Sequence, residues 1–416
     1  MEKRRFVICF DGTWNTPDKG AKPTNVVKMV RAVRSHGDDG ASQLVFYDKG
    51  VGSGRGMDKY LGGIFGLGLT ENVVDGYRFV ANNYEPGDEI YIFGFSRGAY
   101  TARSLAGLIG LAGILTPANL GNDLAKTIDI YREKDIDRAE KLRRIAALGL
   151  EERRPARIRC VGVWDTVGSL GIPGDRGRTF LGGKYYFHDV ELGDYVDVAL
   201  HAVAVDEKRS AFSPTLWVSK DGQPLGERQR VEQVWFAGAH SNVGGSYSDS
   251  TLSDIAFDWM VKRVMAHTGL SLFNPDANAP DLRNAAARSI DSRSALYFVS
   301  SRFPYQRIVN GCIPDGGGFG EWFRRKFPKY DRRNIPPDNL KTVNEHLHVS
   351  VLERWRHDSV LHDCKDDNDC RTSRYRPLTL GAVIAAHHAG QSMPVVGWDG
   401  QIMNAADAAE VWPAAG

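Results

Sequence analysis

Short apolar runs recur along the chain and alternate with longer stretches of helical periodicity. The runs are rich in β-branched and aromatic residues, which is typical of strands buried on both faces of a sheet. Stretches such as NVVKMVRAV and LTENVVDGYRFVANNY separate them. This alternation predicts an α/β fold with a mostly parallel central sheet and helices on both faces. The expected strands are 5–10, 43–48, 89–94, 158–165 and 231–239.

Polar and small residues gather where these expected strands end. The first strand runs into FDGTWN and the second into YDKGVGSG. The third ends at Ser96, the fourth at Asp165, and the fifth runs into a loop with His240. Functional groups of parallel α/β sheets lie at the carboxyl ends of their strands. The sequence therefore predicts a functional site at this edge.

Residues 94–98 read G-F-S-R-G, the spacing of a nucleophile elbow. The spacing alone is weak evidence, because 45 of the 416 residues are glycine. Its setting is more specific, since the strand EIYIF precedes it and the helical stretch RGAYTARSLAGLIGLAGIL follows. We interpret Ser96 as a nucleophile at a strand-to-helix corner. The alternative is a structural turn.

Asp165 and His240 follow Ser96 in the chain order of the triads of α/β-hydrolases. Both are expected at the same edge of the sheet as Ser96. We interpret Asp165 as the acid and His240 as the base. The alternative for Asp165 is a turn or helix cap, and for His240 a structural histidine.

Other His and Asp residues compete for these roles. His201 lies among alternating apolar residues and is better read as a buried structural histidine, whereas Asp206 is an alternative acid. His387 and His388 have weak context. We expect Asp254 to cap the helix IAFDWMVKRVM.

An oxyanion hole needs two backbone N–H donors. We expect one from Arg97 and the other from the loop after the first strand, at Gly12 or Thr13, with Asp11 bracing that loop. The segment FDGT also partly matches haloacid-dehalogenase phosphatases. Their nucleophilic aspartate position is Cys9 in this chain, so that match is a decoy.

Composition and charge exclude several classes of protein. The chain is 42% hydrophobic and 25% charged, with a net charge of +2, so no global basic field points to nucleic acid. No apolar run approaches the 18 residues or more of a membrane span. The apolar stretch after the charged start is too short for a signal peptide, so we expect a cytoplasmic protein in the producing cell. Delivery to a target cell is left open.

The five cysteines do not form a disulfide framework. Cys9 and Cys160 fall in expected buried strands. Cys364 and Cys370 could close a loop disulfide, or act with His362 as metal ligands, although the spacing fits no common zinc pattern. We expect no metal and no cofactor.

We expect a single domain over residues 1–416. Residues 115–155 read as a helical insertion and 174–230 as a candidate cap over the site. Residues 268–416 read as a C-terminal portion packed on the core.

Seven motifs in order give the chain a family resemblance over about residues 5–380. They are FDGTWN, YDKGVGSG, PGDEIYIFGFSRGAYTARSLAG, VGVWDTVGSLG, HAVAVDEKRSAF, VWFAGAHSNVGGSY and VSVLERW with YRPLTL. The set resembles an uncharacterised α/β-hydrolase family that includes type VI secretion phospholipase effectors. The resemblance implies a Ser-Asp-His triad at Ser96, Asp165 and His240.

The resulting hypothesis is a serine hydrolase that cleaves acyl esters through an acyl-enzyme, with a phospholipid or small ester as substrate. Peripheral membrane contact is expected for a lipid substrate, and an immunity or secretion partner if the protein is an effector. The alternatives are a soluble esterase or thioesterase, and a non-catalytic binding module on the same fold.

Overall fold

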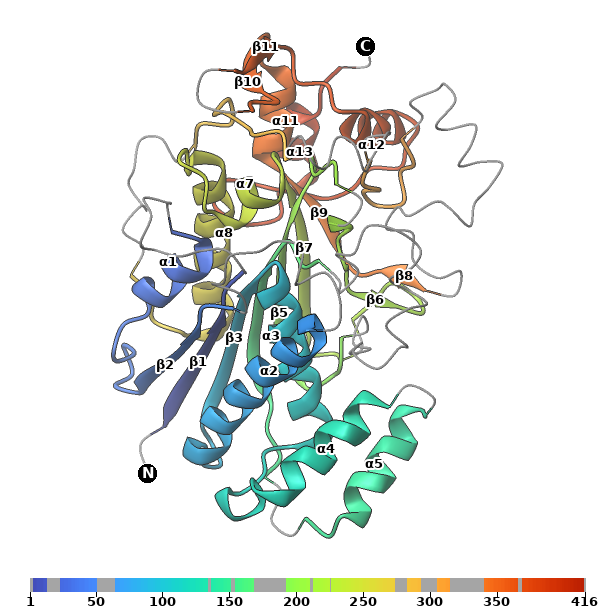
Figure 1. Ribbon diagram of the computed structural model, residues 1–416. Helices are drawn as coiled ribbons and strands as arrows, with labels where there is room; N and C mark the ends of the chain where they lie inside the picture. Colours follow the sequence, from blue (N-terminus) through green and yellow to red (C-terminus); the bar gives the residue numbers. More distant parts are fainter. Residues whose placement is uncertain are drawn as a thin grey trace.

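The computed structural model describes residues 3–12, 23–50, 64–133, 136–150, 154–167, 192–209, 212–224, 226–273, 283–292, 305–314, 340–365 and 369–414. Figure 1 shows a central sheet with helices packed on both sides of it.

Eight strands form the central sheet of the described residues, in the order β12-β9-β7-β5-β4-β3-β1-β2. Every neighbouring pair in this sheet is parallel. The expected α/β architecture with a parallel central sheet is therefore confirmed. The strands are β1 (Arg4–Phe10), β2 (Ser42–Asp48), β3 (Glu89–Phe95), β4 (Ile158–Trp164), β5 (Val196–Ala204), β7 (Arg230–Phe236), β9 (Glu345–His348) and β12 (Val395–Val396).

The strand order reverses direction between β1 and β3. From β1 the chain moves outward to β2, returns to β3 beside β1, and then builds outward on the other side. Such a reversal leaves a crevice at the carboxyl ends of the two central strands, which is where ligands bind in doubly wound sheets. The loop after β1 and the turn after β3 meet at this point.

Helices cover both faces of the sheet and bury separate apolar clusters. On one face α2 and α3 pack over β1, β3 and β4, and on the other α1 and α8 pack over β1, β3, β4 and β5. The helices α4 and α5, whose bounds are given below, form a hairpin at the bottom of Figure 1. The helices are α1 (Asn25–Ala32), α2 (Ile64–Asn83), α3 (Arg97–Ala112), the 3-10 turn η3 (Pro117–Asn119), α4 (Asn122–Arg132), α5 (Arg138–Ala147), α7 (His240–Gly244) and α8 (Thr251–Thr268).

The C-terminal portion extends the sheet and adds a third apolar cluster. β9 pairs with β7, and β12 pairs with β9. An apolar cluster around Trp235, Leu347 and Leu380 packs the helices of this portion against these strands. This portion is integrated with the core. Its other elements are β8 (Lys341–Thr342), which pairs with β6 (Val218–Ser219), α11 (Val349–Arg356), β10 (Val360–His362), β11 (Arg371–Ser373), α12 (Leu378–His388) and α13 (Ala405–Val411).

The candidate cap contains a strand of the central sheet. Residues 196–204 form β5, in the middle of the sheet, so this part of 174–230 is not a cap. The buried imidazole of His201 is satisfied in this strand, as expected for a structural histidine. Its Nε2 accepts the Thr166 N–H at 3.1 Å and its Nδ1 lies 3.3 Å from Gln233 Oε1. Residues 174–191 of the candidate cap lie outside the described residues.

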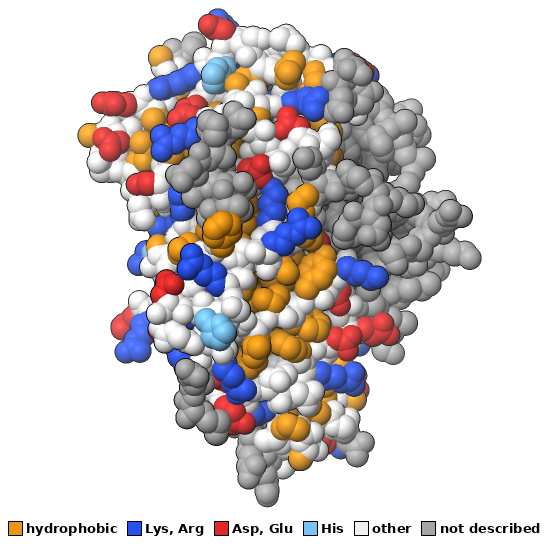
Figure 2. All heavy atoms as spheres, turned by 90° about the vertical axis from the view of Figure 1, so that its left-hand side faces the viewer, with side chains coloured by type: hydrophobic (Ala, Val, Ile, Leu, Met, Phe, Trp, Pro, Cys, Tyr) orange, Lys and Arg blue, Asp and Glu red, His pale blue; other side chains and the backbone are white. Residues whose placement is uncertain are grey.

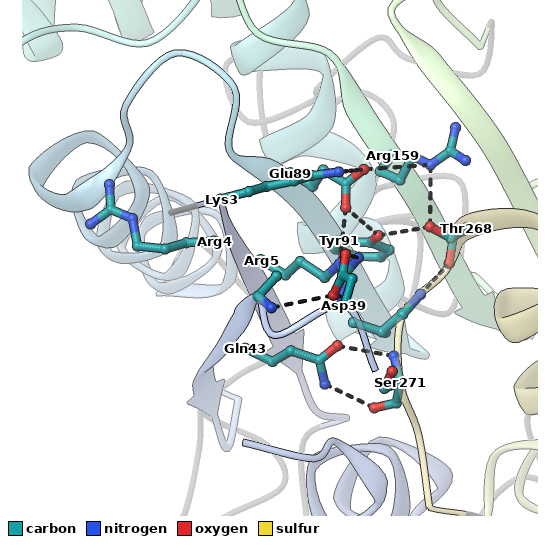
Figure 3. A network of polar contacts seen from close by, with 12 residues as sticks. Lys3, Arg4, Arg5, Asp39, Gln43, Glu89, Tyr91, Arg159, Thr268 and Ser271 are labelled. Atoms are coloured by element: carbon teal, nitrogen blue, oxygen red, sulfur yellow. Dashed lines mark hydrogen bonds and ion pairs between the residues drawn. The ribbon is translucent and has the colours of Figure 1, made fainter. Parts of the chain in front are cut away.

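The amino ends of the strands are held together by a charged network (Figure 3). Arg5 of β1 lies between two carboxylates, 2.5 Å from Asp39 and 3.0 Å from Glu89. Tyr91 donates its hydroxyl to Glu89 at 2.9 Å, and Lys3 pairs with Glu89 at 2.8 Å. Charged side chains thus bind β1 to β3 at the end opposite the strand ends that carry Ser96 and Asp165.

Candidate functional site

Ser96 occupies a tight corner between β3 and α3. Its backbone has φ 60° and ψ −119°, a strained conformation for a residue with a side chain. A Cβ at Gly98 would overlap the carbonyl oxygens of Phe10 and Asp11, and one at Gly94 would overlap the Gly98 carbonyl. Both glycines of the G-F-S-R-G pattern are therefore required for close backbone approach.

His240 lies between Ser96 and Asp165. Its Nε2 is 2.8 Å from Ser96 Oγ, and its Nδ1 is 2.6 Å from Asp165 Oδ2. Asp165 follows β4 directly, and the backbone N–H of Ser96 donates to the Trp164 carbonyl at 3.0 Å, so the ends of β3 and β4 are level. The structure brings together the three residues that the sequence pattern selected. His240, however, begins α7 after β7, which is separated from β4 by β5.

Arg307 completes the surroundings of Asp165, and no sequence motif pointed to it. Its Nη1 lies 2.5 Å from Asp165 Oδ1 and its Nη2 lies 2.9 Å from Oδ2. The Ala204 N–H also donates to Oδ1, at 2.9 Å. Asp165 and Arg307 are both fully buried. The signal that could have found Arg307 is its charge in an otherwise uncharged segment, QRIVNG, but the segment has no characteristic spacing.

Aromatic and charged side chains enclose the imidazole of His240. The Phe95 ring lies 4.6 Å from it, and the Phe212 ring meets it edge-on at 5.0 Å. Glu207 accepts the His240 backbone N–H at 3.3 Å and is paired with Arg209 at 2.8 Å. This packing restricts the rotation of the imidazole and excludes water from one side of it.

The electrostatic environment favours a neutral imidazole beside an ionised carboxylate. Burial opposes ionisation of Asp165, but Arg307 and His240 outweigh it and hold the pKa of Asp165 well below its usual range. Burial lowers the pKa of His240, although Asp165 acts in the opposite direction. A neutral His240 with Nδ1–H donated to Asp165 leaves Nε2 free to accept the Ser96 proton.

This environment predicts the pH dependence of any reaction that uses His240 as a base. Because the pKa of His240 is below its ordinary value of 6.5, the acid limb of a kcat/KM profile should have its midpoint below pH 6.5. The rate should be maximal above that pH and fall as His240 gains a proton. Initial rates on a neutral ester between pH 4 and 9 would measure it. A midpoint well above pH 6.5 would contradict it.

The expected oxyanion donors have different surroundings. Arg97 is the first residue of α3, where helix N-termini present backbone N–H groups. Gly12 lies beside Ser96, but its N–H donates to Asp11 Oδ1 at 2.7 Å, so the structure does not leave it for an oxyanion. The Asp11 carboxylate accepts this N–H because Gly12 is the next residue in the chain. Thr13 lies outside the described residues.

Asp11 also binds two neighbouring segments. Its Oδ2 accepts the Thr24 hydroxyl at 2.8 Å and the Tyr47 hydroxyl at 3.0 Å. Asp11 thereby links the loop after β1 to α1 and to the end of β2.

The competing residues have other contacts. Asp206 accepts the Gly238 N–H at 2.7 Å and the Tyr375 hydroxyl. His387 stacks on Trp412 near the end of the described chain, and His388 contacts Pro413. Asp254 does not cap α8, because the helix begins at Thr251. Asp254 lies in its first turn, where it accepts the Ser250 hydroxyl at 2.8 Å.

Cys364 and Cys370 are joined by a disulfide, so neither thiol is available as a metal ligand. Within the described ranges, no group of three or more His, Cys, Asp or Glu residues is arranged to hold a metal ion. No described helix is both long and apolar enough to cross a membrane.

Comparisons with known proteins identify a family and several relatives of this chain. The family model "T6SS, Phospholipase effector Tle1-like, catalytic domain" matches residues 4–263. The uncharacterised protein YEL023C of Saccharomyces cerevisiae is 29% identical over 232 residues, which is 50% of this chain and 32% of that protein.

Two solved structures are also similar. The Tle1 effector bound to the VgrG spike of the type 6 secretion system shares 18% identity at a TM-score of 0.34, over 59% of this chain and 52% of that one. An uncharacterised protein from Pseudomonas aeruginosa shares 19% identity at a TM-score of 0.37, over 67% and 48%. The chain thus spans about half of these structures and about a third of the yeast relative. Because the family model covers more than half of the chain, the protein belongs to the family of Tle1-like type VI secretion phospholipase effectors, through their catalytic domain.

Proposed function

We propose that the protein is a serine hydrolase that cleaves the acyl esters of phospholipids. The observation that carries the proposal is the continuous chain of hydrogen bonds from Ser96 Oγ to His240 Nε2, at 2.8 Å, and from His240 Nδ1 to Asp165 Oδ2, at 2.6 Å. Nucleophile, base and orienting acid are within hydrogen-bond reach of one another, as serine catalysis requires. Membership of a phospholipase effector family supports the lipid substrate.

The reaction follows from these contacts. Ser96 Oγ attacks the ester carbonyl carbon while His240 Nε2 takes the hydroxyl proton. The tetrahedral intermediate collapses, the bond to the alkoxy oxygen breaks, and His240 returns the proton to the leaving alcohol. Water then attacks the acyl-enzyme in the same way and releases the fatty acid. Asp165 stays ionised throughout and stabilises the imidazolium.

The developing negative charge on the carbonyl oxygen needs donors at the start of α3. The backbone N–H of Arg97 and the positive end of the helix dipole are the proposed source. A second donor at Gly12 requires its bond to Asp11 to open, and Thr13 is the other candidate from that loop.

An apolar surface near the site supports peripheral contact with a lipid surface. Figure 2 shows apolar side chains gathered in a band, with Lys and Arg side chains beside them, on the side of the molecule where β2 is the edge strand. Leu44, Val45 and Tyr47 of β2 are 39%, 37% and 36% exposed. The Tyr47 hydroxyl donates a hydrogen bond to Asp11, so the exposed strand is in contact with the loop beside Ser96.

Partners and a location are part of the same proposal. One similar structure is an effector bound to a VgrG spike. For this chain we propose residence in the cytoplasm of the producing cell. If it acts as an effector, we propose a secretion partner for delivery and an immunity partner for protection.

A substrate panel tests the proposal. Wild-type protein and Ser96→Ala are assayed on short soluble p-nitrophenyl esters, on thioesters and on phospholipid vesicles. We expect Ser96-dependent release of fatty acid from vesicles. Activity on short esters alone would support a soluble esterase instead. The absence of any Ser96-dependent hydrolysis would contradict the proposal and favour a non-catalytic binding module.

A further inference from the structure

Arg307 is a fully buried cation whose Nη1 and Nη2 atoms donate to groups around the catalytic centre. Besides both oxygens of Asp165, its guanidinium binds the Ala204 carbonyl at 2.6 Å and the Phe212 carbonyl at 2.7 Å. Ala204 ends β5, and the Phe212 ring packs against His240. Arg307 therefore links Asp165 to Phe212, whose ring packs against the His240 imidazole.

We infer that Arg307 is a positioning residue for the Ser96–His240–Asp165 centre, and that the C-terminal portion is thereby part of this centre. The inference rests on the proposed function. Arg307 lies beyond residues 4–263, the part that the catalytic-domain model matches. The backbone carbonyl of Arg307 accepts the Thr379 hydroxyl of α12 at 3.1 Å, which anchors it in the C-terminal portion.

The geometry shows why a guanidinium is needed at this place. A buried carboxylate is strongly destabilised unless it is paired and fully hydrogen-bonded. Without Arg307, the Asp165 carboxylate would keep only the Ala204 N–H and His240 as hydrogen-bond partners among the described residues. The planar fork of arginine satisfies both oxygens and sets the plane of the carboxylate, so Oδ2 faces His240 Nδ1.

The cation also affects protonation at the site. Arg307 favours the ionised form of Asp165 and opposes a second positive charge on His240. The other charged groups near the imidazole are Glu207 and Arg209, which neutralise each other. His201, on β5, is buried with its pKa lowered to about 3 by burial and by Arg103, so it adds no charge.

The test replaces Arg307 by Met and by Lys, with Arg354 as the matched control. Arg354 is the other fully buried arginine among the described residues, but its guanidinium binds Ala285, Ala287, Ser289 and Leu361, with no contact to Asp165 or His240. The kcat/KM profile on a short ester is measured against pH. The titration of His240 is followed by NMR in protein with ¹⁵N-labelled histidine, assigned by comparison with His240→Gln.

For Arg307→Met we expect the plateau rate to fall about 10- to 100-fold and the acid limb to move up by about one pH unit. The upward direction holds whether His240 or Asp165 becomes the titrating group, because loss of a cation raises the pKa of both. Arg307→Lys should recover part of the rate, since it keeps the charge but not the fork. If the Arg307→Met protein does not fold, the plateau rate of Arg307→Lys provides the test.

Arg354→Met should lower the unfolding temperature without moving the acid limb. An unchanged acid limb and an unchanged His240 titration in Arg307→Met would overturn the inference, as would a wild-type plateau rate in Arg307→Lys. So would equal shifts in the Arg307 and Arg354 variants. If the wild-type protein hydrolyses no ester, the proposed function fails, whereas the NMR titration still decides on Arg307.

Discussion

Replacing Ser96 by alanine should reduce kcat roughly 10⁴-fold or more on any ester that the protein hydrolyses. The hydroxyl oxygen is the atom that forms the acyl-enzyme, and no other group within the chain of hydrogen bonds can replace it. His240 would keep its bond to Asp165, so the variant should fold as the wild type does. The measurement is fatty acid release together with thermal unfolding of the same samples.

Ser104→Ala provides the control for this substitution. Ser104 is a buried serine on the same helix, α3, and its hydroxyl donates only to the Tyr100 carbonyl, at 2.8 Å. This variant should retain nearly wild-type activity. Hydrolysis that survives in Ser96→Ala would exclude Ser96 as the nucleophile.

Replacing Gly98 by alanine should destabilise the folded protein by about 3 kcal/mol or more. The added Cβ would overlap the carbonyl oxygens of Phe10 and Asp11, which belong to the backbone of β1 and its loop. A flexible side chain could move aside, but these carbonyls are held, since the Asp11 N–H donates to Asp48 at 2.8 Å. α3 would be pushed away from β1, and Ser96 with it.

Gly121→Ala is the matched control, because no atom lies within 4 Å of the Cβ it would add. Its free energy of unfolding in urea should be close to that of the wild type. The Gly98 variant should yield less folded protein, unfold at lower urea concentration and lose activity. Equal stability of the two variants would show that α3 can shift without cost, contrary to the tight packing at the elbow.

Much of the sheet could be predicted because its strands are apolar on both faces. β1, β3 and β4 read as largely apolar runs, and a parallel sheet covered by helices favours that pattern. Ser96 and Asp165 followed from the same logic, since polar residues directly after buried strands collect at one edge. The side chain of His240 joins them through the loop after β7.

The elements that were missed lack such a pattern. β5 carries Asp197 and His201 within the strand, and its polar side chains are satisfied only by neighbours from other segments. β12 is two residues long and is a strand only because β9 lies beside it. Propensity over so few residues cannot indicate this pairing.

The environment of the site depends on contacts between distant parts of the chain. Arg307 is 142 residues from Asp165, and no motif joins them. The position of Gly12 beside Ser96 could be predicted, but the bond from its N–H to Asp11 could not, because it depends on the local turn of the loop. Candidate catalytic residues at strand ends can therefore be predicted from sequence. The residues that orient them and shift their pKa values are identified only once the fold is known.

Covalent trapping tests the central claim most directly. The folded wild-type protein is treated with a fluorophosphonate probe, and the modified peptide is identified by mass spectrometry. We expect one adduct, on the peptide that contains Ser96. This adduct should be absent in Ser96→Ala and should form much more slowly in His240→Gln. No adduct on folded wild-type protein, or an adduct on another residue, would contradict Ser96 as the nucleophile of an ester hydrolase.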